Sequence, residues 1–294
     1  MSSIKSRNVS REDKNAIVGG TLYLVATPIG NLSDISERAL KVMEEVDFIA
    51  AEDTRNTGKL LAYFGIQKSM VSYFEHNKRE RGEIIAARLL NGESCALLTD
   101  AGTPAISDPG EDLVRLCAEK NIPVTSIPGC SAVVNALALS ALPTGRFCFE
   151  GFLSTNKNER FSRLEEIKSD KRTTVFYEAP HKLKKTLEDI LSVFGDRKIA
   201  LCRELTKLNE EIIRTTISGA VSYYGETEPR GEYVLVIEGA SDEELLKDSF
   251  FAHMTVEEHL NHYIESGMSK MEATKAVAKD RGVAKSVIYK EINK

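Results

Sequence analysis

Charged residues follow several apolar runs of this sequence. Asp53 and Arg55 come directly after the run DFIAA, and Arg203, Glu204 and Lys207 come directly after the run KIALC. A carboxylate in such a position can accept a proton from a weak nucleophile, and an ammonium can stabilise a developing negative charge. Simpler structural roles are also open: Asp53 and Arg55 can fix their own loop, and Arg203 and Glu204 can form an ion pair.

Glu178 and His181 flank Pro180 in the run FYEAPHKL and have the same two interpretations. They can do acid–base chemistry, or they can cap the helix that Pro180 opens at its first turn. Three more histidines lie near the C-terminus without a carboxylate-rich pattern, and we interpret them as surface or helix-face residues: His253, His259 and His262. The five cysteines are scattered and form no CxxC pair, so we expect no metal site and no disulfide framework.

Alternating strand-like and helix-like segments must position these residues. In the first half of the chain, the predicted strands span residues 21–26, 47–51, 95–99 and 124–127, and the predicted helices span 36–46, 81–90, 113–118 and 131–142. This alternation indicates an α/β layer with a mostly parallel sheet. A second alternating block follows a composition break at ALPTGRF, with predicted strands at 173–177, 198–202 and 232–237 and a helix opened by Pro180.

The last segment has a different character. It contains two capping-box patterns, TVEE and SKME, and a glycine, Gly282, before a final short helix at 285–292. Three short helices with such a turn resemble a helix-turn-helix, and residues 268–294 carry 7 Lys/Arg against 3 Asp/Glu. The domain organisation that we expect is a flexible tail at 1–18, α/β domains at 19–145 and 146–240, a linker at 241–250 and a helical extension at 251–294.

Composition narrows the class of protein. The net charge of −5 excludes a uniformly basic nucleic-acid binder, although it allows local basic patches. No apolar run approaches the roughly 18 residues of a membrane span. The polar N-terminal residues lack the apolar centre of a signal peptide. We therefore expect a cytoplasmic protein without membrane contact.

Four strand ends carry loops rich in Gly, Pro, Asp, Thr or Ser. Their sequences are TPIGNLSD at 27–34, EDTR at 52–55, DAGTPAISDPG at 100–110 and PGCSA at 128–132. Ligands of open α/β sheets bind outside the carboxyl ends of the strands, so these loops predict a ligand cleft. The chain has no GxGxxG after a strand and no GxxxxGK[ST], which disfavours dinucleotide and ATP sites. Small, non-basic loops suit an adenosine with a positively charged appendage, such as S-adenosylmethionine.

TPIGN, DAGTPAISDPG and PGCSA, in this order, resemble the tetrapyrrole-methylase superfamily of S-adenosylmethionine-dependent methyltransferases. The runs AEDTR, GFLS, FYEAPHKL, RELTK and GEYVLVIEG narrow the resemblance to the branch that 2′-O-methylates a cytidine in bacterial small-subunit (16S) ribosomal RNA. The resemblance covers residues 19–240 and implies two α/β domains with the cofactor cleft between them. It also implies a homodimer and a partner that is small-subunit ribosomal RNA, naked or in the assembled subunit. The helices at 251–294 resemble the C-terminal extension of that branch.

The resemblance further implies which residues contact the cofactor. They are Pro28, Thr99, Asp100, Ala101, Gly102, Ile106, Ser131 and Ala132, with Glu178 and Leu205 at more variable positions. A ribose 2′-hydroxyl is a poor nucleophile and needs a general base or a cation that stabilises its alkoxide. Our candidates for this role are Lys207, Glu204 and Asp53.

Candidate substrate-binding residues are Arg55, His181, Arg203, Arg160 and Arg163. Glutamates interleave with Arg160 and Arg163, so a solvated helix face is the competing interpretation of those two. Two other functions stay open. One is a small-molecule methylase that acts on a tetrapyrrole, which the C-terminal helices and the runs AEDTR and RELTK disfavour. The other is a non-enzymatic, S-adenosylmethionine-responsive DNA-binding regulator, which the modest charge of the C-terminal helices disfavours.

Overall fold

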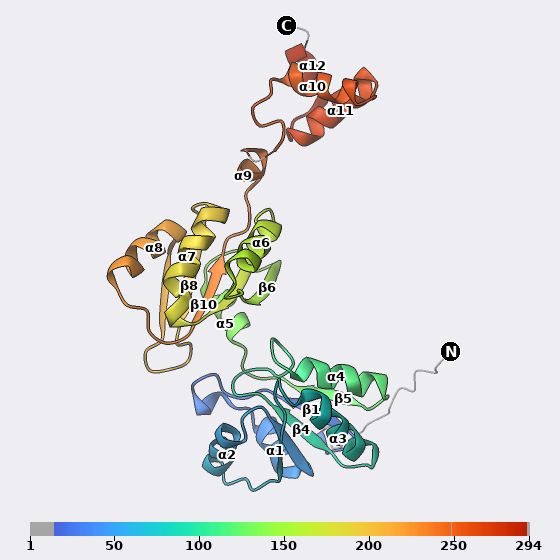
Figure 1. The fold of residues 1–294 in the computed structure, drawn as a ribbon, viewed down its shortest axis with the longest axis vertical. Coiled ribbons are helices and arrows are strands. Elements are labelled where there is room, and N and C mark those ends of the chain that lie inside the picture. Colours follow the sequence, from blue (N-terminus) through green and yellow to red (C-terminus); the bar gives the residue numbers. More distant parts are fainter. Residues whose placement is uncertain (1–14, 248, 293–294) are drawn as a thin grey trace.

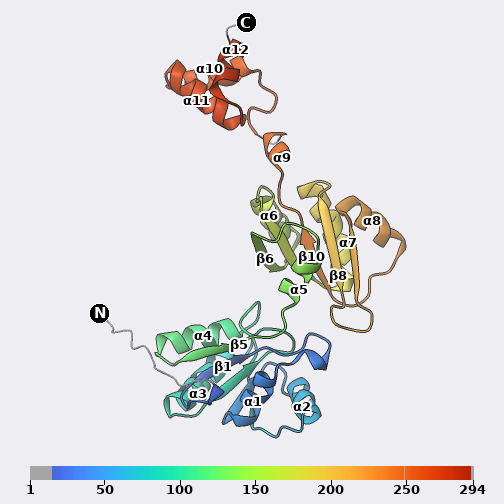
Figure 2. The same cartoon turned by 180° about the vertical axis from the view of Figure 1, so that it is seen from behind.

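A computed structural model describes residues 15–247 and 249–292. Residues 1–14 of the predicted flexible tail and residues 293–294 of the predicted extension lie outside the described residues. Two sheet-containing units and a helical unit follow one another along the long axis of the molecule (Figures 1 and 2). Within the described ranges, no helix has the length and apolar character that crossing a membrane requires.

The first unit is a parallel sheet covered on both faces. Its strands are β1 (Leu22–Val25), β2 (Phe48–Ala51), β3 (Met70–Ser72), β4 (Cys95–Leu98) and β5 (Val124–Ile127), in the spatial order β3-β2-β4-β1-β5. Every pairing is parallel, as the alternation predicts. One face packs on α1 (Glu37–Glu45) and α2 (Thr54–Tyr63), and the other packs on α3 (Lys78–Leu90) and α4 (Gly110–Glu119). Burial on both faces explains why β1, β2 and β4 are continuous apolar runs, whereas the edge strands β3 and β5 are less buried and contain Ser or Thr.

The strand order creates a switch point between β1 and β4. These strands are neighbours, but β1 leads to α1 on one face of the sheet and β4 leads to α4 on the other. The loops that follow them, 26–36 and 99–109, therefore diverge and leave a crevice at the carboxyl end of the sheet. These loops contain the runs TPIGN and DAGTPAISDP.

The second unit is a mixed sheet, which differs from the first. Its strands are β6 (Phe147–Phe152), β7 (Thr173–Glu178), β8 (Lys198–Arg203), β9 (Glu211–Thr216) and β10 (Tyr233–Ile237), in the order β6-β7-β10-β8-β9. Only β6 and β7 pair in parallel, and the other pairings are antiparallel. One face packs on α6 (Lys157–Ile167), α7 (Pro180–Phe194) and α8 (Ile217–Glu226). Both units are α/β, so the predicted fold class is confirmed.

The helix α5 (Ala132–Leu139) covers the other face of this second sheet. Val133, Ala136 and Leu137 share a core with Val175 of β7 and Cys202 of β8. The composition break lies after this segment and therefore predicts that it belongs to the first domain. The packing assigns it to the second unit, since one apolar face of the helix is buried against that sheet while Val134 and Asn135 on the other face are exposed.

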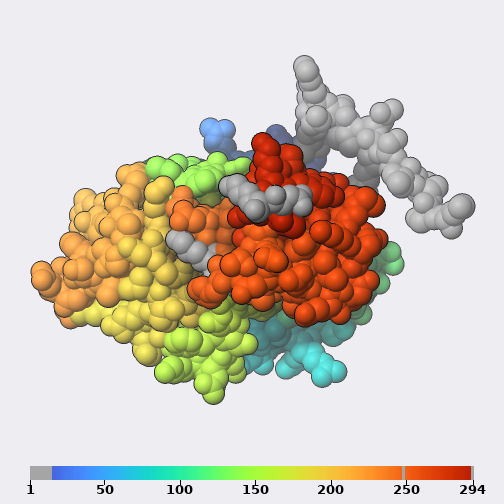
Figure 3. Space-filling model, turned by 90° about the horizontal axis from the view of Figure 1, so that it is seen from above, coloured from blue at the N-terminus to red at the C-terminus, as the bar shows by residue number. Residues whose placement is uncertain are grey.

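The helical unit begins after α9 (Asp242–Lys247) and contains α10 (Val256–Glu265), α11 (Lys270–Asp280) and α12 (Lys285–Ile292). Both predicted capping boxes form, at Thr255 and Ser269. The three helices enclose a small core of their own. Seen along the long axis, this unit leaves the yellow surface of α7 uncovered (Figure 3).

Of the two predicted roles for His259, surface or helix-face residue, the structure shows the second: it lies on the buried face of α10 and is 0% exposed. Its ring stacks on Phe251 with 4.4 Å between the ring centroids. Its Nδ1 accepts a hydrogen bond from Arg281 Nε at 3.2 Å. The imidazole is thus a core group of the helical unit.

Candidate functional site

The loops at the switch point form one hydrogen-bonded wall. The backbone N–H of Thr27 donates to the Gly102 carbonyl at 2.9 Å, and the N–H of Gly102 donates back to the Thr27 carbonyl at 3.0 Å. Thr99 Oγ1 donates to Glu52 Oε2 at 2.8 Å, and Thr103 Oγ1 donates to the Cys130 carbonyl at 3.0 Å. The long loop after β4 is therefore tied to the loops after β1 and β5.

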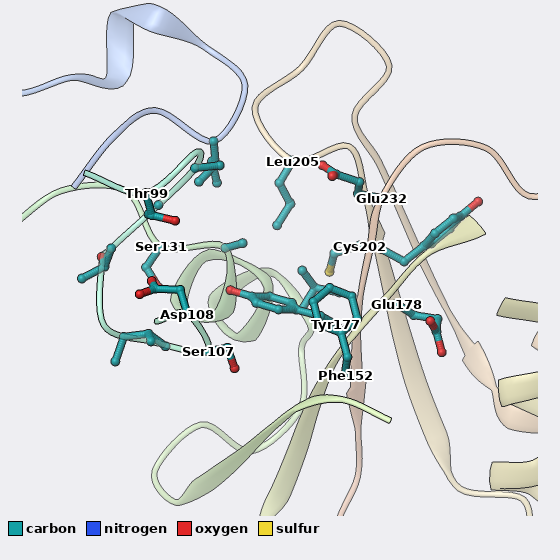
Figure 4. Close-up of a pocket in the computed structure, with 18 of the residues that line it drawn as sticks. Thr99, Ser107, Asp108, Ser131, Phe152, Tyr177, Glu178, Cys202, Leu205 and Glu232 are labelled. Carbon is teal, nitrogen blue, oxygen red and sulfur yellow. The ribbon is translucent and has the colours of Figure 1, made fainter. Parts of the chain in front are cut away.

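A cavity of about 310 Å³ lies between this wall and the carboxyl ends of β7 and β8 in the second unit. Figure 4 shows side chains from both units facing it. Eight of the ten expected cofactor-contact residues line the cavity: Thr99, Ala101, Gly102, Ile106, Ser131, Ala132, Glu178 and Leu205. Pro28 and Asp100 line a second cavity of about 410 Å³, which shares Thr99 with the first.

Carboxylates dominate the charge of the first cavity. Its lining includes Glu52, Asp108, Glu204 and Glu232, against the single ammonium of Lys207. Asp108 Oδ1 accepts hydrogen bonds from two backbone N–H groups, at 3.0 and 2.7 Å, and its Oδ2 is buried without a hydrogen-bond partner among the described residues. Because several carboxylates face one ammonium in this lining, the cavity suits a ligand that carries positive charge.

Glu178 also lines this cavity, but its carboxylate is turned toward α7. It accepts hydrogen bonds from the Ala179 backbone at 2.8 Å and from Thr186 Oγ1 at 2.5 Å, and it pairs with Lys182 at 3.1 Å. The N-cap of α7 is Ala179 and has no side-chain cap hydrogen bond, so Glu178 fixes the turn before the helix and does not cap its first-turn N–H groups. Its backbone and side-chain stem remain at the cavity.

Lys207 forms a cluster with two glutamates at the cavity wall. Its Nζ lies 2.9 Å from Glu204 Oε1 and 2.8 Å from Glu232 Oε2. Burial lowers the pKa of Lys207, but the two carboxylates outweigh it, so the net pKa is raised and the amine stays protonated. The aliphatic stem of Lys207 lies against Gly30 in the first unit. The contact is so close that a Cβ added to Gly30 would lie 2.3 Å from Lys207 Cγ.

The family of this chain follows from comparison with known proteins. A family model described as tetrapyrrole (corrin/porphyrin) methylases matches residues 21–220. The chain belongs to the tetrapyrrole methylase family. Three of the proteins similar to this chain are named ribosomal RNA small subunit methyltransferase I. The one from Halalkalibacterium halodurans is 47% identical and covers 95% of both chains, the one from Bacillus subtilis is 45% identical (92% and 93%), and the one from Escherichia coli O157:H7 is 42% identical (92% and 94%).

Solved structures of the tetrapyrrole methylase fold agree with this assignment. Uroporphyrin-III-C-methyltransferase from Thermus thermophilus has a TM-score of 0.54 at 20% identity and covers 74% of this chain and 94% of its own. Diphthine synthase has a TM-score of 0.57 at 14% identity, with 74% and 90% covered. At these identities the likeness shows the fold alone.

The other predicted site residues of this tetrapyrrole methylase lie away from the first cavity. Asp53 is the N-cap of α2 and pairs with the 87% exposed Arg55 at 2.8 Å, and this hydrogen-bonded pair lowers the pKa of Asp53 to about 2. So low a pKa makes Asp53 a weak base, and the loop-fixing interpretation fits both residues. Arg203 pairs across the sheet with Glu211 at 3.2 Å, and His181 is not among the residues that line the cavity.

Arg160 and Arg163 differ sharply although they share one helix. Arg160 is 6% exposed, pairs with the buried Asp189 at 2.7 Å and donates to the Ser154 carbonyl at 2.8 Å. This burial leaves no guanidinium surface for RNA, so Arg160 leaves the substrate-binding set. Arg163 is exposed and pairs with Glu150 and Glu166, each at 2.7 Å, as the solvated-face interpretation expects.

Several lining residues were not singled out by the sequence analysis: Ser107, Asp108, Phe152, Tyr177 and Glu232. All five lie inside the sequence runs on which the family resemblance rests, so these runs were the signal that could have identified them as cavity residues. Cys202 also lines the cavity, but burial raises its pKa to about 11, which keeps the thiol protonated. Across residues 15–247 and 249–292, no three His, Cys, Asp or Glu side chains group as metal ligands.

Proposed function

We propose that this chain is an S-adenosylmethionine-dependent methyltransferase that 2′-O-methylates a cytidine of small-subunit ribosomal RNA. The observation that carries the proposal is the meeting of three loops, TPIGN, DAGTP and PGCSA, at one carboxylate-rich cavity between two α/β units. The names of relatives at 42–47% identity support the RNA substrate over a tetrapyrrole or DNA.

The residues of the cavity fit this cofactor. Its ammonium and sulfonium carry positive charge, and the lining offers carboxylates, among them Glu52, Glu204 and Glu232. Thr99 and Ser131 add hydroxyl groups, and Ala132 and Leu205 add apolar surface. When bound, the cofactor supplies an electrophilic methyl group.

Lys207 is the best-placed cation for the 2′-oxygen. Since its pKa is raised, it cannot serve as the base at neutral pH, and its role is to stabilise negative charge on the 2′-oxygen. The proton of the hydroxyl passes to Glu204, the predicted catalytic carboxylate that lines the cavity, as the oxygen takes the methyl group and the sulfur keeps the electron pair of the broken bond. Glu204 and Glu232 hold the ammonium at the cavity wall. Methyl transfer is an in-line displacement, so this fixed position also helps to orient the hydroxyl.

The remaining proposals concern partners and place of action. The partner is small-subunit ribosomal RNA, either naked or in the assembled subunit, and the enzyme acts in the cytoplasm as a homodimer. The basic segment 268–294 of the helical unit, with 7 Lys/Arg against 3 Asp/Glu, adds RNA contacts, because phosphates attract Lys and Arg side chains.

The test combines cofactor binding with RNA methylation. Calorimetry should show S-adenosylmethionine binding of equal affinity with and without a chelator. Mass spectrometry of ribosomal RNA should show one added methyl group on a cytidine ribose, with naked RNA and assembled subunits compared as substrates. Cofactor binding without RNA methylation, combined with methylation of a tetrapyrrole or with specific DNA binding, would replace this proposal by one of its rivals.

A further inference from the structure

An exposed aromatic ring lines the cavity at the end of β6. The side chain of Phe152 is 58% exposed, although it lies next to other large apolar groups. Its ring centroid is 5.4 Å from that of Tyr177, and Tyr177 in turn contacts Phe149 at 4.9 Å. Figure 4 shows Phe152 and Tyr177 side by side across the cavity from Ser107 and Asp108. An aromatic surface therefore faces a cavity whose other lining residues are both polar, such as Thr99 and Ser131, and apolar, such as Leu205.

A β-bulge directs Phe152 to this position. Phe149 pairs with Val175 and Gly151 pairs with Phe176, so Glu150 is an extra residue in β6. Residues three apart in a regular strand point to opposite faces, yet Phe149 and Phe152 both contact Tyr177. Bulges of this kind re-aim a side chain and are frequent beside active sites.

Gly151 allows the bulge and brings β6 close to the first unit. Its φ of 65° is a conformation that favours glycine. A Cβ at this position would lie 3.0 Å from Ser107 Oγ, on the long loop after β4. Lys182 Nζ lies 5.3 Å from the centroid of the Phe152 ring and adds a cation beside it. The ring thus stands between the cofactor-side loop and a positive charge.

We propose that Phe152, supported by Tyr177, stacks on the nucleobase of the nucleotide whose ribose is methylated. This inference rests on the proposed RNA substrate. A ribose that enters a cavity between two domains must bring its base out of the RNA stack, and proteins replace the lost stacking with aromatic side chains. Stacking tolerates any base, so Phe152 contributes to RNA affinity and not to the choice of cytidine.

The experiment compares four variants of the full chain. Phe152→Ala removes the ring, Phe152→Leu keeps apolar volume without a flat face, and Phe152→Trp keeps a flat face. Phe147→Ala is the matched control, because Phe147 is 40% exposed and begins the same strand without lining the cavity. Thermal unfolding of each variant checks that it folds.

The expected result separates RNA from cofactor. Phe152→Ala and Phe152→Leu should lower kcat/KM for RNA by about 5- to 150-fold, the range for loss of one base–aromatic stack. Phe152→Trp and Phe147→Ala should stay near the wild-type value. The Kd for S-adenosylmethionine should change less than about twofold in all four variants, because the proposed partner of the Phe152 ring is the RNA base and not the cofactor.

An RNA with an abasic site at the methylated nucleotide sharpens the test. The kcat/KM of the wild-type enzyme should fall with this RNA by about the same factor as the kcat/KM of Phe152→Ala falls with the intact RNA. For Phe152→Ala with the abasic RNA, the two effects on kcat/KM should not add. Equal kcat/KM in wild type and Phe152→Ala would overturn the inference. A Kd for the cofactor that weakens as much as kcat/KM would also overturn it, because the ring would then hold the adenine. Absence of RNA methylation by the wild-type enzyme would overturn the proposed function itself, and this inference with it.

Discussion

Replacement of Lys207 by Met tests the proposed charge-stabilising role most directly. Met keeps an unbranched stem beside Gly30 and removes the ammonium that lies 2.9 Å from Glu204 and 2.8 Å from Glu232. Loss of one such group lowers kcat by about 10²- to 10³-fold in other enzymes, so we expect this range for Lys207→Met and Lys207→Ala. Because Glu232 is 81% exposed, solvent screens its ion pair, and we expect unfolding free energy to change by no more than about 1 kcal/mol.

The charge state of Lys207 decides how an arginine variant behaves. The folded-state pKa is raised above its ordinary value of 10.5, so the stabilisation from its ion pairs is fully present below pH 10.5 and is lost only as pH rises through the folded-state pKa. Between pH 6 and 9 the amine is charged and cannot accept a proton. Lys207→Arg keeps the charge and should restore part of the activity.

Single-turnover methylation at saturating cofactor measures these differences without product release. The Kd for S-adenosylmethionine should stay near the wild-type value in all three variants. Folded Lys207→Met with wild-type turnover would refute the assignment. An arginine variant as inactive as the methionine variant would show that Lys207 accepts a proton, which contradicts the electrostatic role.

Three further predictions concern other parts of the chain. Deletion of residues 251–294 should leave the cofactor affinity measured by calorimetry unchanged and should weaken RNA methylation, because the cavity residues all precede residue 235. Equal loss of cofactor affinity and RNA methylation would show that these helices have a structural role. Burial lowers the pKa of His259, and Arg281 is a second cause. The helical unit should therefore lose thermal stability as pH falls below about 6.5, and the His259→Gln variant should not show this pH dependence. Identical pH profiles for the wild type and the variant would contradict a buried neutral imidazole. Arg160→Ala should lower the unfolding free energy by about 3–5 kcal/mol in chemical denaturation by leaving Asp189 buried and unpaired, whereas the exposed Arg163→Ala should change it by about 1 kcal/mol or less; similar values for the two would contradict the burial argument.

Local pattern was enough to place the parallel sheet of the first unit but not the direction of strands in the second. Strands such as β4 are buried on both faces and form continuous apolar runs, which periodicity detects. β3 has three residues, β6 contains a bulge, and β9 is a partly polar edge strand, so each gives a weak signal. The antiparallel pairing of β10 depends on contacts between segments far apart in sequence, which no local window contains.

The candidate site shows the same division. Gly- and Pro-rich loops after parallel strands predict a cleft because their place at the sheet edge follows from topology. The direction of a side chain does not follow in this way. The Glu178 carboxylate points to α7 because it accepts a hydrogen bond from Thr186 and pairs with Lys182 there. The Arg160 guanidinium points inward because it pairs with Asp189. In both cases the sequence showed the residue type and its position. It did not show the partner residue in space, which determines whether the side chain faces the cavity or the core.

Because α5 packs on the second sheet, the chain passes between the two α/β units once, through residues 128–131. That short crossing is the covalent connection between the units, and Ser131 at its end also lines the cavity. A ligand that contacts both walls therefore binds beside this connection. Such a ligand restrains the angle between the units, so a substitution that changed the resting angle would change the affinity of the ligand without contacting it.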